Sequence, residues 1–148
     1  MKHRLVMACA LLLVVGACGG DSKDVGKAAD AAKASRTIEI RALDNKFEPT
    51  DIKVKPDETV TLSVTNAGTE LHELLLGDKK TQDDHDKEMA EMGDAEMKMS
   101  DEGNRIFVEP GETKQLTWTF PSKGSVIFGC HMPGDYAAGM KGTVSVSA

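Results

Sequence analysis

The sequence lacks the short signatures of the common hydrolases, and only a few histidines are available for catalysis. It contains no GxSxG nucleophile motif and no HExxH zinc motif. Of its four histidines, His3 lies in the N-terminal leader described below, which leaves three in the rest of the chain. One of these, His72, has no evident nucleophile partner. We therefore expect a protein that is not an enzyme.

Positive charge is outnumbered by negative charge. The chain has 18 Lys and Arg against 24 Asp and Glu, a net charge of −6. Loss of Lys2 and Arg4 with the leader leaves 16 basic against 24 acidic residues. Such a surface repels a phosphate backbone, so we do not expect nucleic acid as a partner. It suits a basic docking partner, although acidity is also common for solubility alone.

The N-terminal apolar run is too short to cross a membrane. Residues 5–15 are apolar and follow Lys2, His3 and Arg4, whereas a membrane-spanning helix needs about 20 such residues. A basic start, a short apolar centre and small residues before Cys18 predict a secretory signal peptide over residues 1–17. The residues before Cys18 resemble a bacterial lipobox, which implies lipidation of Cys18; the alternative is a plain signal peptide with an incidental cysteine. We expect the lipid to hold the protein on the extracytoplasmic face of the cell envelope, with residues 18–36 as a polar tether.

Cysteine is used sparingly. Three are present, of which Cys9 is lost with the signal peptide and Cys18 carries lipid. Cys130 is then alone, in a compartment where thiols usually form disulfides. An unpaired thiol there is exposed to oxidation unless it is buried or bound to a metal. This favours Cys130 as a metal ligand.

Apolar and polar residues alternate in many short segments from residue 37 onward. This period of two is typical of strands with one buried face. Turn residues such as Pro49, Pro56 and Pro110 separate the segments. The pattern predicts one all-β domain over residues 37–148, a β-sandwich or small barrel. The alternating apolar positions are Ile38, Ile40, Ile52, Val54, Val60, Leu62, Val64, Leu116, Trp118, Phe120, Val144 and Val146.

Residues 77–104 interrupt this pattern and predict an insertion with one short helix. Asp83 and Asp84 near the start and Gly93 past the end bound a helix over residues 82–92. Two hypotheses explain its thioethers: packing of the helix onto the sandwich, which we favour, or an auxiliary Cu(I) site. The residues concerned are His85, Met89 and Met92 on one helical face, followed by Met97 and Met99.

The stretch GCHMPGDYAAGMKG, residues 129–142, concentrates candidate metal ligands. Cys130, Asp135 and Met140 lie in a loop punctuated by Gly and Pro. Soft sulfur ligands favour copper or zinc over magnesium or calcium. His72 lies far upstream in an apolar run, where a folded sheet can bring it back to the loop. A lone histidine in such a run is most often a core residue, but with a solitary thiol and a downstream Met it becomes a ligand candidate.

These motifs together resemble the cupredoxins, the blue copper proteins, over nearly all of residues 37–148. The resemblance rests on DNKFEP at residues 44–49, EPGET at 109–113, LTWTF at 116–120, His72 and the 130–140 loop. The helical insertion with its methionines resembles a bacterial extracytoplasmic lipoprotein branch of the family. The resemblance implies a Greek-key β-sandwich that binds one copper ion, with His72, Cys130 and Met140 as ligands.

The loop departs from the family pattern at one position. In CHxPGH, the pattern of the related branch, the final histidine is a ligand, and here that position is Asp135. His131 matches a second-shell histidine of the pattern. Three outcomes are open: Asp135 ligates through oxygen, His131 swings in as an alternative ligand, or the site binds metal weakly. We expect Asp135 to be a ligand or near-ligand. Glu73 is a further oxygen candidate, but alternation along a strand aims it away from His72.

Two functions fit these features. The first is a membrane-tethered cupredoxin-like protein that binds one copper ion and passes electrons to a redox partner outside the cytoplasm. The second is a copper-sequestering or copper-handling lipoprotein without redox turnover, which the replacement of the loop histidine by Asp135 motivates. Its partner would be another copper-handling protein.

Overall fold

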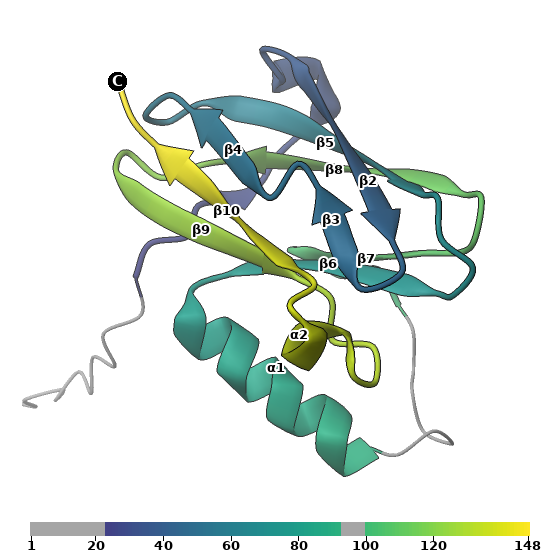
Figure 1. The fold of residues 1–148 in the computed structure, drawn as a ribbon. Coiled ribbons are helices and arrows are strands. Elements are labelled where there is room, and N and C mark those ends of the chain that lie inside the picture. Colours follow the sequence, from purple (N-terminus) through teal and green to yellow (C-terminus); the bar gives the residue numbers. More distant parts are fainter. Residues whose placement is uncertain (1–22, 93–99) are drawn as a thin grey trace, which may run out of the picture.

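The structure is a computed structural model that describes residues 23–92 and 100–148 (Figure 1). The predicted signal peptide, Cys18, Met97 and Met99 lie outside the described residues. Within them, no helix combines the length and the apolar character needed to span a bilayer.

Two five-stranded sheets pack face to face (Figure 1). The first sheet has the order β1 (Lys27–Ala28), β8 (Thr113–Thr119), β5 (Thr59–Asn66), β2 (Thr37–Leu43) and β3 (Lys46–Glu48). The second has the order β4 (Asp51–Val54), β10 (Lys141–Val146), β9 (Gly124–Gly129), β6 (His72–Gly77) and β7 (Arg105–Val108). The predicted all-β sandwich is therefore confirmed.

The core lies between the sheets and is built by the alternating residues. Val60, Leu62 and Val64 of β5 are at most 1% exposed, and Leu74 and Phe128 of the second sheet are fully buried. Full burial of such a side chain stabilises the fold by about 1.5–3 kcal/mol. The sheets are thus fixed against each other, which gives the ends of β6, β9 and β10 defined positions.

Some elements differ from the prediction. Helix α1 (Lys79–Met92) begins three residues early, because the Asp78 carboxylate accepts hydrogen bonds from the Thr81 amide and hydroxyl, each at 2.8 Å. A second, four-residue helix, α2 (Asp135–Ala138), forms inside the predicted ligand loop. Strands β3, β7 and β9 were not predicted; in β9 the apolar residues 126–128 are consecutive and hide the alternation.

The N-terminal segment is folded onto the domain. Strand β1 pairs with β8, and the Trp118 indole N–H donates to the Val25 carbonyl at 2.7 Å. A 3₁₀ turn, η1 (Ala31–Lys33), follows. Residues 18–36 were predicted to be a tether, but from Val25 onward they belong to the sandwich, because Val25 packs on the core and β1 extends the first sheet.

Candidate metal centre

The predicted ligands come from one end of the second sheet. His72 is the first residue of β6, Cys130 directly follows β9, and Met140 directly precedes β10. Strand β9 pairs with both β6 and β10, so these ends are adjacent. Asp135 opens helix α2, which lies in the connection between β9 and β10 (Figure 1). The sheet therefore brings together residues 63 positions apart in sequence.

Three donor atoms converge. Oδ2 of Asp135 lies 3.1 Å from the Cys130 Sγ and 3.1 Å from the His72 Nδ1, and Sγ lies 3.9 Å from Nδ1. By plane geometry, the point equidistant from the three atoms is about 2.0 Å from each, close to ordinary metal–ligand distances of about 2.0–2.3 Å. All three residues are buried, at 0–6% exposure. The group fits a single metal ion without rearrangement of the sheet.

Backbone hydrogen bonds close the ligand loop. The Cys130 N–H donates to the Met140 carbonyl at 3.0 Å, and the Met140 N–H donates to the Asp135 carbonyl at 2.9 Å. Met140 is fully buried and is one of three sulfur-bearing residues of the loop, with Cys130 and Met132. Thiolate, imidazole and thioether together are the donor set of mononuclear copper sites, which makes Met140 the candidate for the remaining ligand.

Asp44 orients the His72 ring through the nitrogen that faces away from Cys130 and Asp135. Its Nε2 lies 3.3 Å from Oδ1 of Asp44, which leaves Nδ1 facing Cys130 and Asp135. The Thr69 amide and hydroxyl both donate to Asp44 and lower the pKa of its carboxyl, so Asp44 stays ionised. Sequence reasoning used Asp44 only as part of a family motif. Nothing in the sequence places it beside a residue 28 positions away.

The Cys130 thiol resists ionisation in the structure. Burial is the largest cause of its raised pKa, and the neighbouring Asp135 carboxylate adds to it. The thiol donates to Oδ2 of that carboxylate. Because a thiolate is the metal-binding form, binding of a thiophilic ion requires the thiol proton to leave.

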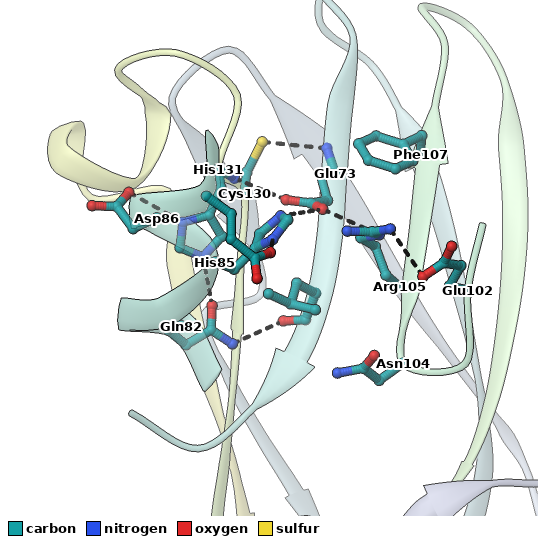
Figure 2. Close-up of polar contacts among 12 residues, drawn as sticks. Glu73, Gln82, His85, Asp86, Glu102, Asn104, Arg105, Phe107, Cys130 and His131 are labelled. Carbon is teal, nitrogen blue, oxygen red and sulfur yellow. Dashed lines mark hydrogen bonds and ion pairs between the residues drawn. The ribbon is translucent and has the colours of Figure 1, made fainter. Parts of the chain in front are cut away.

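His131 points away from the three donors. Its Nε2 lies 2.8 Å from Gln82 Oε1 and its Nδ1 3.2 Å from Asp86 Oδ1, both on helix α1 (Figure 2). Its ring stacks on Tyr136 with centroids 4.2 Å apart. This follows from the opposite orientation of neighbours in extended backbone, and it leaves Asp135 as the loop residue that faces His72 and Cys130.

The residues of the predicted auxiliary Cu(I) site fall into two groups. His85, Met89 and Met92 lie on helix α1, whereas Met97 and Met99 lie outside the described residues. His85 faces inward, with Nε2 2.9 Å from Glu73 Oε1 and Nδ1 3.4 Å from Glu88. Met89 is partly buried and packs against the hydrophobic core, as the packing hypothesis expects. The auxiliary Cu(I) site, which includes Met97 and Met99, stays a prediction.

Fold and site together define a class: a small β-sandwich protein with a buried thiol–imidazole–carboxylate centre at one sheet end. Residues 33–147 match the copper binding proteins of the plastocyanin/azurin family. The copper-resistant cuproprotein CopI of Pseudomonas aeruginosa is 37% identical, over 93% of this chain and 94% of that protein. The protein of the same name from Vibrio cholerae is 35% identical, over 79% and 69%.

Solved structures agree with the sequence comparison. The reduced auracyanin of Roseiflexus castenholzii has a TM-score of 0.63 and 25% identity, covering 78% of this chain and 99% of that one. The chain therefore belongs to the plastocyanin/azurin family of copper-binding proteins. It is a cupredoxin, and its cofactor is copper.

Proposed function

We propose that the protein holds one copper ion between His72, Cys130, Asp135 and Met140, and that it serves copper resistance by binding copper rather than by catalysis. One observation carries the proposal. The Asp135 carboxylate oxygen lies 3.1 Å from both the thiol sulfur and the imidazole nitrogen, at the loop position of the missing imidazole.

The donor set supports a copper-holding role. The sulfur atoms of Cys130 and Met140 favour Cu(I), whereas imidazole and carboxylate ligands suit Cu(II). A site with both kinds of donor retains copper in either oxidation state, which suits sequestration. Two relatives at 35% and 37% identity are described as copper-resistant cuproproteins.

Electron transfer is the second candidate. The donors are buried and already close together on a rigid sheet, so little reorganisation accompanies electron gain or loss. A redox partner protein would then replace a copper-handling protein as the physiological partner. The two functions differ in electron-exchange rate, which is fast for a carrier and slow for a storage site.

We place this function at the extracytoplasmic face of the cell envelope, with the chain anchored by lipid on Cys18. The leader sequence and the lipobox-like residues support this location. The Lys23 N–H donates to the Asp78 Oδ2 at 3.2 Å, so the chain contacts the folded domain within five residues of Cys18.

Copper titration followed by optical and electron-spin spectra tests the proposal, with Cys130→Ala and Asp135→His as matched variants. We expect one equivalent bound in the wild type, with a weak thiolate-to-copper band that Cys130→Ala abolishes. Asp135→His should convert the site to a strongly blue one. A wild type that is already strongly blue and exchanges electrons rapidly would favour the second candidate. Absence of copper binding would refute both.

In cells, the copper-resistance role has its own readout. Cells that express the wild type should tolerate more copper than cells that express Cys130→Ala at the same protein level. Equal tolerance would contradict the role in resistance while leaving copper binding intact.

A further inference from the structure

The sandwich has two ends, and the metal centre occupies one of them. It lies where β6 begins and β9 ends, and we call the opposite end, made of residues 23–36, 53–58 and 121–125, the base (Figure 1). Strand β9 starts at the base with Gly124 and ends directly before Cys130. A strand rises about 3.3 Å per residue, so the base and the metal centre are about 20 Å apart.

Contacts join the three segments of the base into one surface. Arg36, which precedes β2, donates through its Nη2 to the Lys53 carbonyl of β4 at 2.8 Å. Lys23 and Lys123 line one groove of about 400 Å³ between the N-terminal segment and the turn from β8 to β9. The N-terminal segment is therefore part of this surface.

The base is basic, whereas the rest of the described chain is acidic. The base carries seven basic and four acidic side chains, a balance of +3. The other described residues carry eight basic and 17 acidic side chains, a balance of −9. The basic residues of the base are all exposed: Lys23, Lys27, Lys33, Arg36, Lys53, Lys55 and Lys123.

The six lysines of the base are available to an external anion. Among the described residues, no ion pair involves any of them, whereas Lys46, Lys80 and Lys114 elsewhere each pair with a carboxylate. Two acidic side chains of the base have partners within it. Asp30 accepts from the Ala32 amide at 2.9 Å, and Glu58 pairs with Arg36. The uncompensated charge of this surface is thus positive.

The base is also where the chain leads toward its predicted lipid anchor. Only four residues separate Lys23 from Cys18, and the Lys23 N–H is held by the Asp78 carboxylate at 3.2 Å. A lipid on Cys18 therefore brings the bilayer to the base. Lys and Arg side chains close to an anionic bilayer surface are attracted to it, whereas the acidic remainder of the domain is repelled.

We propose that the base is a membrane-docking surface for anionic phospholipid headgroups, which holds the metal centre on the side of the domain that faces away from the bilayer. The orientation rests on the lipid anchor of the proposed function; the attraction of the base to anionic headgroups does not. In this orientation the metal centre stays accessible to a partner protein in the extracytoplasmic space.

Acetylation of lysines in the lipidated protein tests the orientation. A water-soluble acetylating reagent is applied to protein on vesicles, and mass spectrometry of its peptides gives the rate at each lysine. On vesicles that contain phosphatidylglycerol, Lys23, Lys27 and Lys123 should react at least about fivefold more slowly than on vesicles of pure phosphatidylcholine.

Lysines outside the base are internal controls for this experiment. Lys46, Lys80 and Lys87 are exposed and should react at the same rate on both kinds of vesicle. Equal rates for the base lysines on the two vesicles would overturn the proposal. Protection of the base without vesicles that increases with protein concentration would indicate pairing with the acidic surface of a second copy, and would also overturn it.

A second experiment removes the lipid and compares two variants of equal net charge. The mature chain with Cys18→Ser is mixed with phosphatidylglycerol-containing vesicles at low ionic strength, and bound protein is measured by sedimentation. One variant replaces three lysines of the base with Gln, and the other replaces three lysines elsewhere. The substitutions are Lys23→Gln, Lys27→Gln and Lys123→Gln in the first, and Lys46→Gln, Lys80→Gln and Lys87→Gln in the second.

The position of the charge decides the expected result. Removing three lysines next to the bilayer should lower vesicle affinity about 100-fold, whereas the other variant should lose less than about fivefold. Equal losses in the two variants would overturn the docking surface. If the mass of the purified protein shows no lipid on Cys18, the anchored location fails, but this comparison still decides whether the base binds anionic headgroups.

Discussion

Replacing Glu58 with Gln should destabilise the fold at neutral pH and much less in acid. Glu58 accepts from the Arg36 Nε at 3.0 Å, from the Ser35 hydroxyl at 2.9 Å and from the Lys55 amide at 2.8 Å. These bonds lower the pKa of Glu58 from 4.5 to about 2, with the Arg36 hydrogen bond as the largest cause. They also fix the end of the N-terminal segment to the turn before β5.

The pKa difference sets the size of the effect. The pKa of Glu58 is 4.5 in the unfolded chain and about 2 in the folded protein. This difference adds at most about 3.4 kcal/mol to the free energy of unfolding at neutral pH. Arg36 is 47% exposed, so solvent screening reduces this to about 1–2 kcal/mol. Because the folded pKa is lowered, the stabilisation is complete above pH 4.5 and is lost as the pH falls toward 2. At pH 3 about 60% of it should be gone.

Urea unfolding of the wild type and Glu58→Gln at pH 7 and pH 3 measures this difference. We expect the variant to be less stable by about 1–2 kcal/mol at pH 7, and by less than half of that at pH 3. Lys46 and Glu48 form an exposed pair in β3, so Glu48→Gln is a control that should change little. The same loss at both pH values would refute the assignment to the Glu58 charge.

Three further predictions concern the loop and the N-terminal segment. Gly129→Ala should destabilise the protein and raise Cys130 reactivity, because an added Cβ would lie 2.7 Å from Gln82 Oε1; urea unfolding and thiol labelling measure this, and wild-type behaviour would contradict it. Trp118→Phe should cost about 1 kcal/mol by losing its bond to Val25, and protease cleavage near residue 25 should accelerate; unchanged cleavage would count against docking of the segment. Met140→Leu should keep the fold and change the copper reduction potential, which voltammetry measures; an unaltered potential would remove Met140 from the coordination sphere.

The sandwich could be predicted because its cause is local. Residues such as Val60, Leu62 and Val64 alternate with polar neighbours, and their burial follows from the period of a strand. Strand β9 could not be predicted in this way, because its apolar residues are consecutive. The N-terminal segment docks through long-range contacts, such as the pairing of β1 with β8 and the bond between Trp118 and Val25, which no local pattern reveals.

The candidate site was predictable in composition but not in its supports. Cys130 and Asp135 share one loop, and His72 stood out as a histidine in an apolar run; the structure brings all three together. Glu73 was considered only as an oxygen ligand, and its turn away from His72 agrees with strand alternation. The contacts of Glu73 with His85 and of Gln82 with His131 depend on where helix α1 packs, which the sequence does not specify.

The most direct test of the central claim is a crystal structure of the copper-loaded protein with anomalous data at the copper edge. We expect one copper peak about 2.0–2.3 Å from the Cys130 Sγ, the His72 Nδ1 and an Asp135 carboxylate oxygen. A peak without Asp135 in contact, or with copper held elsewhere, would contradict the assignment of Asp135 as the ligand that replaces the missing histidine.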